Sequence, residues 1–82
     1  MKYYVYIIQS QKDLSYYIGY SSNLESRLDY HNSGRQRYTR NKIPYKLVHS
    51  EEFDNKTEAL KREKQIKSFK GGEAFKKLIG GV

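Results

Sequence analysis

The sequence contains no cysteine and a single proline, Pro44. Without cysteine there can be neither a disulfide nor a thiolate metal site, so packing alone must stabilise the fold. Its apolar runs are only a few residues long, which excludes a membrane-spanning helix and an N-terminal signal peptide and favours a cytoplasmic protein. The 82 residues are expected to form one domain, 1–82, with a modest core.

Acidic residues are scarce relative to basic ones. Nine acids against sixteen lysines and arginines leave a formal net charge of +7. This excess favours a polyanionic partner, because electrostatic attraction dominates the affinity of proteins for nucleic acid. Charge alone leaves simple solubility or attraction to anionic lipid open. Nine of the twelve aromatic residues are tyrosines, whose rings pack while their hydroxyls stay available for chemistry.

Hydrophobic periodicity and turn residues predict a small α+β domain. Alternating, β-branched stretches indicate strands, and apolar residues three and four apart indicate helices. We expect a three-stranded, mainly antiparallel sheet flanked by helices, because the helices must cover apolar sheet surface. The predicted order is β-β-α-β-α-α, with strands over 3–9, 16–20 and 47–53 and helices over about 23–32, 56–69 and 73–79.

Local chemistry at the helix ends supports three of these boundaries. Ser22 with Glu25, and Asn55 with Glu58, have the spacing of a capping box. Gly34 is a natural C-terminal breaker for the first helix.

The first helix carries polar residues beside its apolar face. Leu24 and Leu28 mark the inward side, and Arg27 and His31 lie four residues apart. Residues at this spacing share a helix side, so Arg27 and His31 are expected to project together beside the buried stripe. The alternative is that the aliphatic part of Arg27 packs at the boundary between the apolar face and solvent, and that His31 caps the end of the helix.

The second helix carries an acid on its predicted inward stripe. Ala59, Leu60 and Ile66 define this side, and Glu63 falls on it. A buried carboxylate is costly unless it is paired or bound to a metal. Glu63 is therefore a candidate Mg²⁺ ligand, since Mg²⁺ often takes one or two carboxylates together with waters and phosphate oxygens. A salt bridge to a neighbouring lysine or arginine is the alternative.

The connection over 35–46 carries five positive charges and no acid. It is the candidate nucleic-acid-binding segment. By contrast, His49, Glu51 and Glu52 fall on a strand pattern and are expected to be ordinary surface residues. The candidate contact residues in the segment are Arg35, Arg37, Tyr38, Arg40 and Lys42.

Tyrosines occupy both predicted N-terminal strands. Tyr4 and Tyr6 share one face of the first strand and Tyr3 lies on the other, while Tyr17 precedes Ile18-Gly19 in the second. A tyrosine in a strand most often serves packing.

The order of these residues resembles the GIY-YIG nuclease superfamily. The first half-motif is similar to Tyr4-Val5-Tyr6, and the second is Tyr17-Ile18-Gly19. Glycine is replaced by Tyr4 in the first, and Tyr20 stands where members like the DNA-repair incision nuclease UvrC carry lysine. The likeness covers roughly 3–79, and segments 31–34, 37–40 and 59–67 resemble the small stand-alone bacterial branch.

The resemblance implies a phosphodiester-cleaving site with a single divalent ion. Tyr6 and Tyr17 would be the paired site tyrosines, one of them hydrogen-bonding or helping to activate the attacking water. Arg27 would bind the scissile phosphate. Glu63 would anchor one Mg²⁺ or Mn²⁺ ion that stabilises the leaving 3′ oxygen. His31 would act as the general base or assist it, and Gly19 would let backbone approach the site closely.

The general base is open between His31, Tyr6 and Tyr17. We favour His31, because a neutral imidazole takes a proton near pH 7, whereas a tyrosine hydroxyl needs a metal or a cation to do so.

The sequence thus favours a metal-dependent endonuclease acting on nucleic acid, with DNA preferred over RNA and a role in DNA repair or recombination. A recruiting protein could supply specificity, because 82 residues leave no room for a separate DNA-binding module. The alternatives are a catalytically silent nucleic-acid-binding module and a protein-interaction domain. A membrane partner is not expected.

Overall fold

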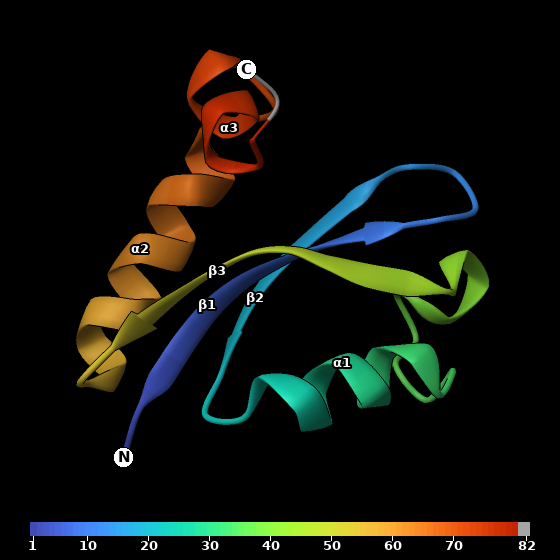
Figure 1. Cartoon of the computed structure of the whole chain (residues 1–82), viewed down its shortest axis with the longest axis horizontal. Helices are drawn as coiled ribbons and strands as arrows, with labels where there is room; N and C mark the ends of the chain where they lie inside the picture. Colours follow the sequence, from blue (N-terminus) through green and yellow to red (C-terminus); the bar gives the residue numbers. More distant parts are fainter. Residues whose placement is uncertain (81–82) are drawn as a thin grey trace.

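The computed structural model describes residues 1–80 and has the predicted α+β order. Figure 1 shows one three-stranded sheet with helices on both sides. Within residues 1–80 no helix is long and apolar enough to span a membrane. The elements are β1 (Tyr3–Ser10), β2 (Tyr16–Ser21), α1 (Leu24–Asn32), the short 3₁₀ helix η1 (Arg40–Lys42), β3 (Tyr45–Phe53), α2 (Lys56–Ser68) and α3 (Glu73–Leu78).

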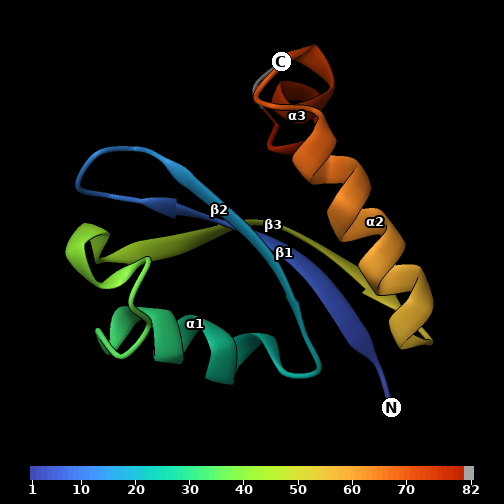
Figure 2. The ribbon, with the colours of Figure 1, turned by 180° about the vertical axis from the view of Figure 1, so that it is seen from behind.

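Strand β1 lies at the centre of the sheet, in the order β2-β1-β3, and pairs antiparallel with both neighbours. Its pairing with β2 sets Tyr6 opposite Gly19. Helices α2 and α3 cover one face and α1 the other, as the view from behind also shows (Figure 2). Strand β2 therefore forms a sheet edge that passes between α1 and α2.

The two faces of β1 bury separate clusters, as its alternation predicts. Val5 and Ile7 pack with Ala59, Ile66 and Phe75 on the side of α2 and α3. On the side of α1 the second cluster contains Tyr6, Ile8 and Tyr45, against which Leu24 and Leu28 pack. Leu60, predicted to face inward, is 38% exposed, because Ala59 and Ile66 already fill the contact between α2 and the sheet.

The cap of α2 is the predicted one, since the Asn55 side chain accepts the Glu58 N–H at 2.9 Å. The prediction that Ser22 caps α1 is wrong. Asn23 does so, and its side chain accepts the Ser26 N–H at 3.0 Å. The reason is that β2 continues to Ser21, so the chain is still turning away from the sheet at residue 22 and the helix begins later.

An ion pair joins α2 to the edge strand β3. The Arg62 guanidinium donates to both oxygens of Glu51, at 2.8 and 3.0 Å, and His49 Nε2 lies 2.7 Å from the same carboxylate. Burial opposes ionisation of Glu51, but the hydrogen bonds and charges of Arg62 and His49 outweigh it and lower its pKa. The expectation that Glu51 and His49 are ordinary surface residues is therefore wrong.

Candidate active site

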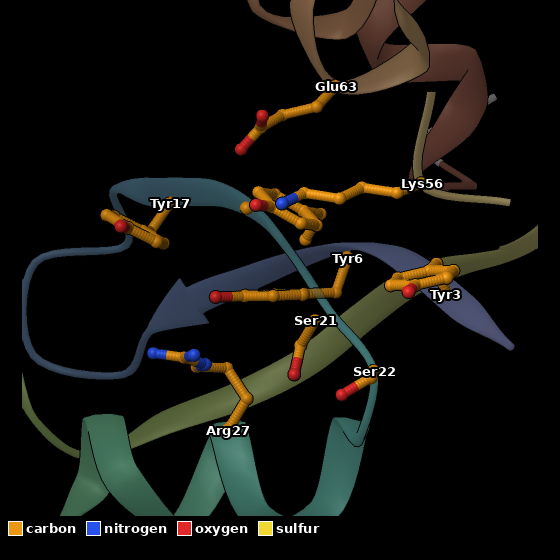
Figure 3. A pocket seen from close by; sticks show the side chains of 10 residues that line it. Tyr3, Tyr6, Tyr17, Ser21, Ser22, Arg27, Lys56 and Glu63 are labelled. Atoms are coloured by element: carbon orange, nitrogen blue, oxygen red, sulfur yellow. The ribbon is translucent and has the colours of Figure 1, made fainter. Parts of the chain in front are cut away.

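A cleft of about 440 Å³ opens at the β2 edge of the sheet, between α1 and α2. Because it straddles the edge strand, it draws side chains from both faces of the sheet. Figure 3 shows Arg27 of α1 on one wall and Glu63 of α2 on the other, with the tyrosines between them. The lining residues are Tyr3, Tyr6, Tyr17, Gly19, Tyr20, Ser21, Ser22, Arg27, Lys56 and Glu63.

Four of the five predicted catalytic residues thus line one cleft: Tyr6, Tyr17, Arg27 and Glu63. They come from β1, β2, α1 and α2, so only the folded chain brings them together. The Tyr6 ring crosses the sheet over Gly19 and stacks with Tyr17 at a centroid distance of 6.5 Å. Its hydroxyl and the Arg27 guanidinium point in the same direction in Figure 3.

His31, the fifth, does not line the cleft. It was predicted to project beside Arg27 at the edge of the buried stripe, but it is 1% exposed and lies behind Tyr6. The physical reason is its place in the last turn of α1, where the helix packs on the sheet and the imidazole finds polar partners on both sides. Direct contact between His31 and a bound phosphate is excluded by this burial.

Those two partners form a buried chain of polar side chains. His31 Nε2 lies 3.0 Å from the Tyr6 hydroxyl, and His31 Nδ1 lies 3.0 Å from the Thr39 hydroxyl. Burial, followed by the charge of Arg27, lowers the pKa of His31, so the imidazole is neutral at pH 7. Burial, with a further contribution from Tyr17, raises the pKa of Tyr6. A neutral imidazole donates one hydrogen bond and accepts one, which matches its two hydroxyl partners.

The charged residues face each other across the cleft. The Arg27 guanidinium carbon lies 5.3 Å from the centre of the Tyr30 ring, and Arg27 has no ion pair within residues 1–80. Glu63 has a side chain only 16% exposed, and Lys67 Nζ lies 3.4 Å from its Oε2. The lysine pairing anticipated as the alternative for Glu63 is therefore present, yet the carboxylate still lines the cleft.

The donor set suits one Mg²⁺ or Mn²⁺ ion better than a softer metal. Within residues 1–80 no group of three or more His, Asp or Glu side chains is placed to share an ion. A single carboxylate on the wall of a polar cleft fits Mg²⁺, which keeps several waters and takes phosphate oxygens of a substrate as further ligands. Glu63 is the residue that would hold it.

The sequence patterns did not identify three further contributors. Lys56 reaches into the cleft from the first turn of α2, and Tyr20 lines it from β2. Thr39 lies behind the cleft and is buried, although the composition of its segment indicates a polar, exposed loop. Neither a lone threonine in a polar segment nor a lysine in the first turn of a helix carries a sequence signal for such a role.

The predicted nucleic-acid-binding residues lie outside the cleft. All five are exposed, and Tyr38 has 79% of its surface exposed. Lys42 Nζ lies 3.5 Å from Asp13, which neutralises part of its charge. Thr39, in the same segment, is connected to the cleft through its contact with His31, which in turn contacts Tyr6. The five are Arg35, Arg37, Tyr38, Arg40 and Lys42.

Comparison with known proteins adds independent information. The family model described as the GIY-YIG catalytic domain matches residues 2–74. The chain is 43% identical over 81 residues to a UPF0213 protein of Staphylococcus saprophyticus, covering 98% of each. It is 51% identical over 65 residues to a UPF0213 protein of Clostridium perfringens, covering 78% of this chain and 69% of that one. A solution NMR structure of a UPF0213 protein from Bacillus halodurans is 35% identical, covers 90% of each chain and gives a TM-score of 0.51.

Proposed function

The chain belongs to the GIY-YIG family of nuclease domains, and on that premise we propose that it is an endonuclease that hydrolyses phosphodiester bonds, in DNA rather than RNA, with one divalent metal ion. The observation that carries the proposal is the cleft itself. It sets a guanidinium and a carboxylate on opposite walls, with two tyrosines between them. Phosphoryl transfer needs these parts: a cation for the phosphate, a metal ligand and a hydroxyl that handles a water proton.

Arg27 binds the scissile phosphate in this mechanism. Its planar guanidinium can donate two parallel hydrogen bonds to phosphate oxygens, and it is free of ion pairs within the described chain. As the phosphorus becomes five-coordinate, negative charge builds on those oxygens. A fixed cation stabilises that charge more than it stabilises the ground state.

Tyr6 and His31 supply a path for the proton of the attacking water. The water gives its proton to the Tyr6 oxygen as Tyr6 gives its own proton to His31 Nε2, while Thr39 accepts the hydrogen bond of His31 Nδ1–H. This path suits a tyrosine of raised pKa, because no free phenolate is formed. The resulting hydroxide attacks phosphorus, the bond to the 3′ oxygen breaks, and that oxygen takes a proton from solvent. The proton on His31 then returns to solvent through Tyr6. Tyr17, half-buried in the same cleft, orients the water.

Glu63 would hold the metal ion, which would supply stabilisation of the charge on the leaving 3′ oxygen. The acid itself contributes orientation: packed on the inner side of α2, it has few other positions to adopt. Lys56 adds a second cation to the wall that bears Glu63 and can contact a neighbouring phosphate.

Substrate selection rests on surfaces around the cleft. Arg35, Arg37 and Arg40 on the basic segment add affinity for the backbone, and a recruiting protein supplies sequence or structure specificity. A role in repair or recombination, a cytoplasmic location and the single-domain organisation stay predictions.

The test is cleavage of a labelled panel of single-stranded, duplex and branched DNA, with an RNA strand for comparison, in Mg²⁺, in Mn²⁺ and in chelator. Metal-dependent cutting of any DNA by the wild-type protein supports the proposal. Salt-sensitive binding with no cutting of any substrate would contradict it and favour a silent nucleic-acid-binding module. Absence of both would favour a protein-interaction domain.

A further inference from the structure

A row of three hollows leads away from the cleft along the outer side of α1. A second hollow, of about 420 Å³, shares Ser21, Ser22 and Arg27 with the cleft. A third, of about 450 Å³, shares Ser26 and Tyr30 with the second. Because each neighbouring pair shares lining residues, the hollows lie side by side in a row that runs from Arg27 to Arg35.

The lining of this row has the chemistry of a nucleic-acid contact. A guanidinium stands at each end, and hydroxyls of Ser26 and Ser33 line the part between them. Tyr30 presents a half-buried ring at the middle, next to the Arg27 guanidinium at 5.3 Å. Phosphates bind to guanidinium and hydroxyl groups, and bases that are not paired stack on aromatic rings.

We propose that this row of hollows, the α1 track, holds a single unpaired strand that continues from the scissile phosphate to Arg35. The inference rests on the proposed nuclease function and narrows its substrate to one with an unpaired stretch on one side of the cut. From Ser26 to Ser33 the helix rises about 10 Å, since each residue adds ~1.5 Å. At ~3.4 Å per stacked nucleotide, this length takes about three nucleotides.

The track favours a single strand over a duplex, because the Tyr30 ring can stack only on a base whose face is exposed. A duplex shields its base faces, so Tyr30 would gain nothing from it. A single strand offers both its phosphates and its bases to the same surface. Neither Arg27 nor Arg35 has an ion pair within residues 1–80, so both cations are available.

Asp29 borders the third hollow, so the proposal also predicts a substitution that increases the affinity for a strand. Its carboxylate repels phosphates that approach Arg35, so Asp29→Asn should tighten binding while Arg35→Ala weakens it. A general loss of folding would weaken both.

The experiment measures fluorescence anisotropy of a labelled twelve-thymidine strand in chelator, where no metal-dependent cutting occurs, over a range of salt. For Arg35→Ala the slope of log affinity against log salt should fall by about 0.7, the value for one phosphate of a single strand. For Tyr30→Ala affinity should fall about fivefold or more, the equivalent of one lost stacked base. Lys64→Ala, an exposed lysine on α2 outside the track, is the matched control and should change affinity less than Arg35→Ala.

Backbone amide shifts of the wild-type protein on addition of the same strand give a second reading that needs no variant. Shifts concentrated at Ser26, Tyr30, Ser33 and Arg35 support the track, and shifts confined to α2 and α3 overturn it. Unchanged affinity in both Arg35→Ala and Tyr30→Ala also overturns it. A protein that binds along the track but cuts nothing in metal would instead overturn the nuclease proposal, so the two failures are distinguishable.

Discussion

Gly19 lies under the Tyr6 ring so closely that a Cβ atom at position 19 would stand 2.5 Å from the Tyr6 hydroxyl oxygen and 2.8 Å from the ring carbon that bears it. The two residues face each other in the β1–β2 pairing. Tyr6 cannot yield freely, because its ring is buried and its hydroxyl is hydrogen-bonded to His31. The absence of a side chain at position 19 is therefore what lets the tyrosine hydroxyl reach the cleft.

Gly19→Ala should displace the Tyr6 hydroxyl and cost about 1–3 kcal/mol of folding free energy through overpacking. A shift of this group by about 1 Å should lower kcat by around a hundredfold. Urea denaturation and single-turnover cleavage measure the two effects. In a Tyr6→Leu background the ring is gone, so the same substitution should cost little stability. An equal cost in both backgrounds would contradict the steric explanation.

Thr39→Val should destabilise the protein by about 1–3 kcal/mol, because it leaves the buried Nδ1 of His31 without a partner. It should also lower kcat with little change in KM, since Thr39 holds the imidazole and does not contact the substrate. Thr39→Ser keeps the hydroxyl and should retain most of the activity. Equal activity in the valine and serine variants would rule out a positioning role for the hydroxyl.

The pH dependence of stability should reveal the buried imidazole. The folded pKa of His31 is lowered by burial and by Arg27, so below the ordinary value of 6.5 the unfolded chain binds the proton more readily. The contribution of His31 to the free energy of unfolding is therefore fully present above this value. It falls with decreasing pH, by at most about 1.4 kcal/mol per pH unit, until the folded pKa is reached. Urea unfolding between about pH 7.5 and 5.5 should show a smaller loss for His31→Gln than for the wild type. Parallel curves would contradict the assignment.

Glu51→Gln should lower the free energy of unfolding by about 1 kcal/mol near neutral pH, because Arg62 loses a charged partner that is only partly exposed. The lowered folded pKa of Glu51 makes this contribution present above the unfolded pKa and lost as the pH falls through the folded one. Wild type and variant should then converge in acid. Glu52→Gln, whose partner Lys2 is half-exposed at 3.6 Å, is the neighbouring control and should have almost no effect.

The order of elements could be predicted because each signal was local. Alternation in β1, the Asn55 cap and the apolar spacing of α2 depend on residues within one or two turns of each other. The predictions failed where tertiary contacts decide. Leu60 fits the inward period of α2 as well as Ala59 does, and only the position of the sheet shows which of them is covered.

The sequence could indicate most of the predicted residues that line the cleft, but not how they are arranged. Motif order indicated Tyr6, Tyr17, Arg27 and Glu63, all of which line the cleft. The burial of His31 could not be predicted, because it depends on Thr39, eight residues later in a segment whose composition indicates an exposed loop. Hydrogen bonds between residues on different elements have no periodic signature in a sequence.

Cleavage by Glu63→Ala, beside Lys67→Ala, tests the proposed nuclease most directly. Both variants disrupt the pair between Glu63 and Lys67 at 3.4 Å, but only the first removes the proposed metal ligand. With labelled DNA in Mg²⁺ or Mn²⁺, Glu63→Ala should lose cutting by at least about a hundredfold and still bind DNA in chelator, whereas Lys67→Ala should cut as the wild type does. Equal cutting by Glu63→Ala and the wild type would contradict a metal-dependent site in this cleft.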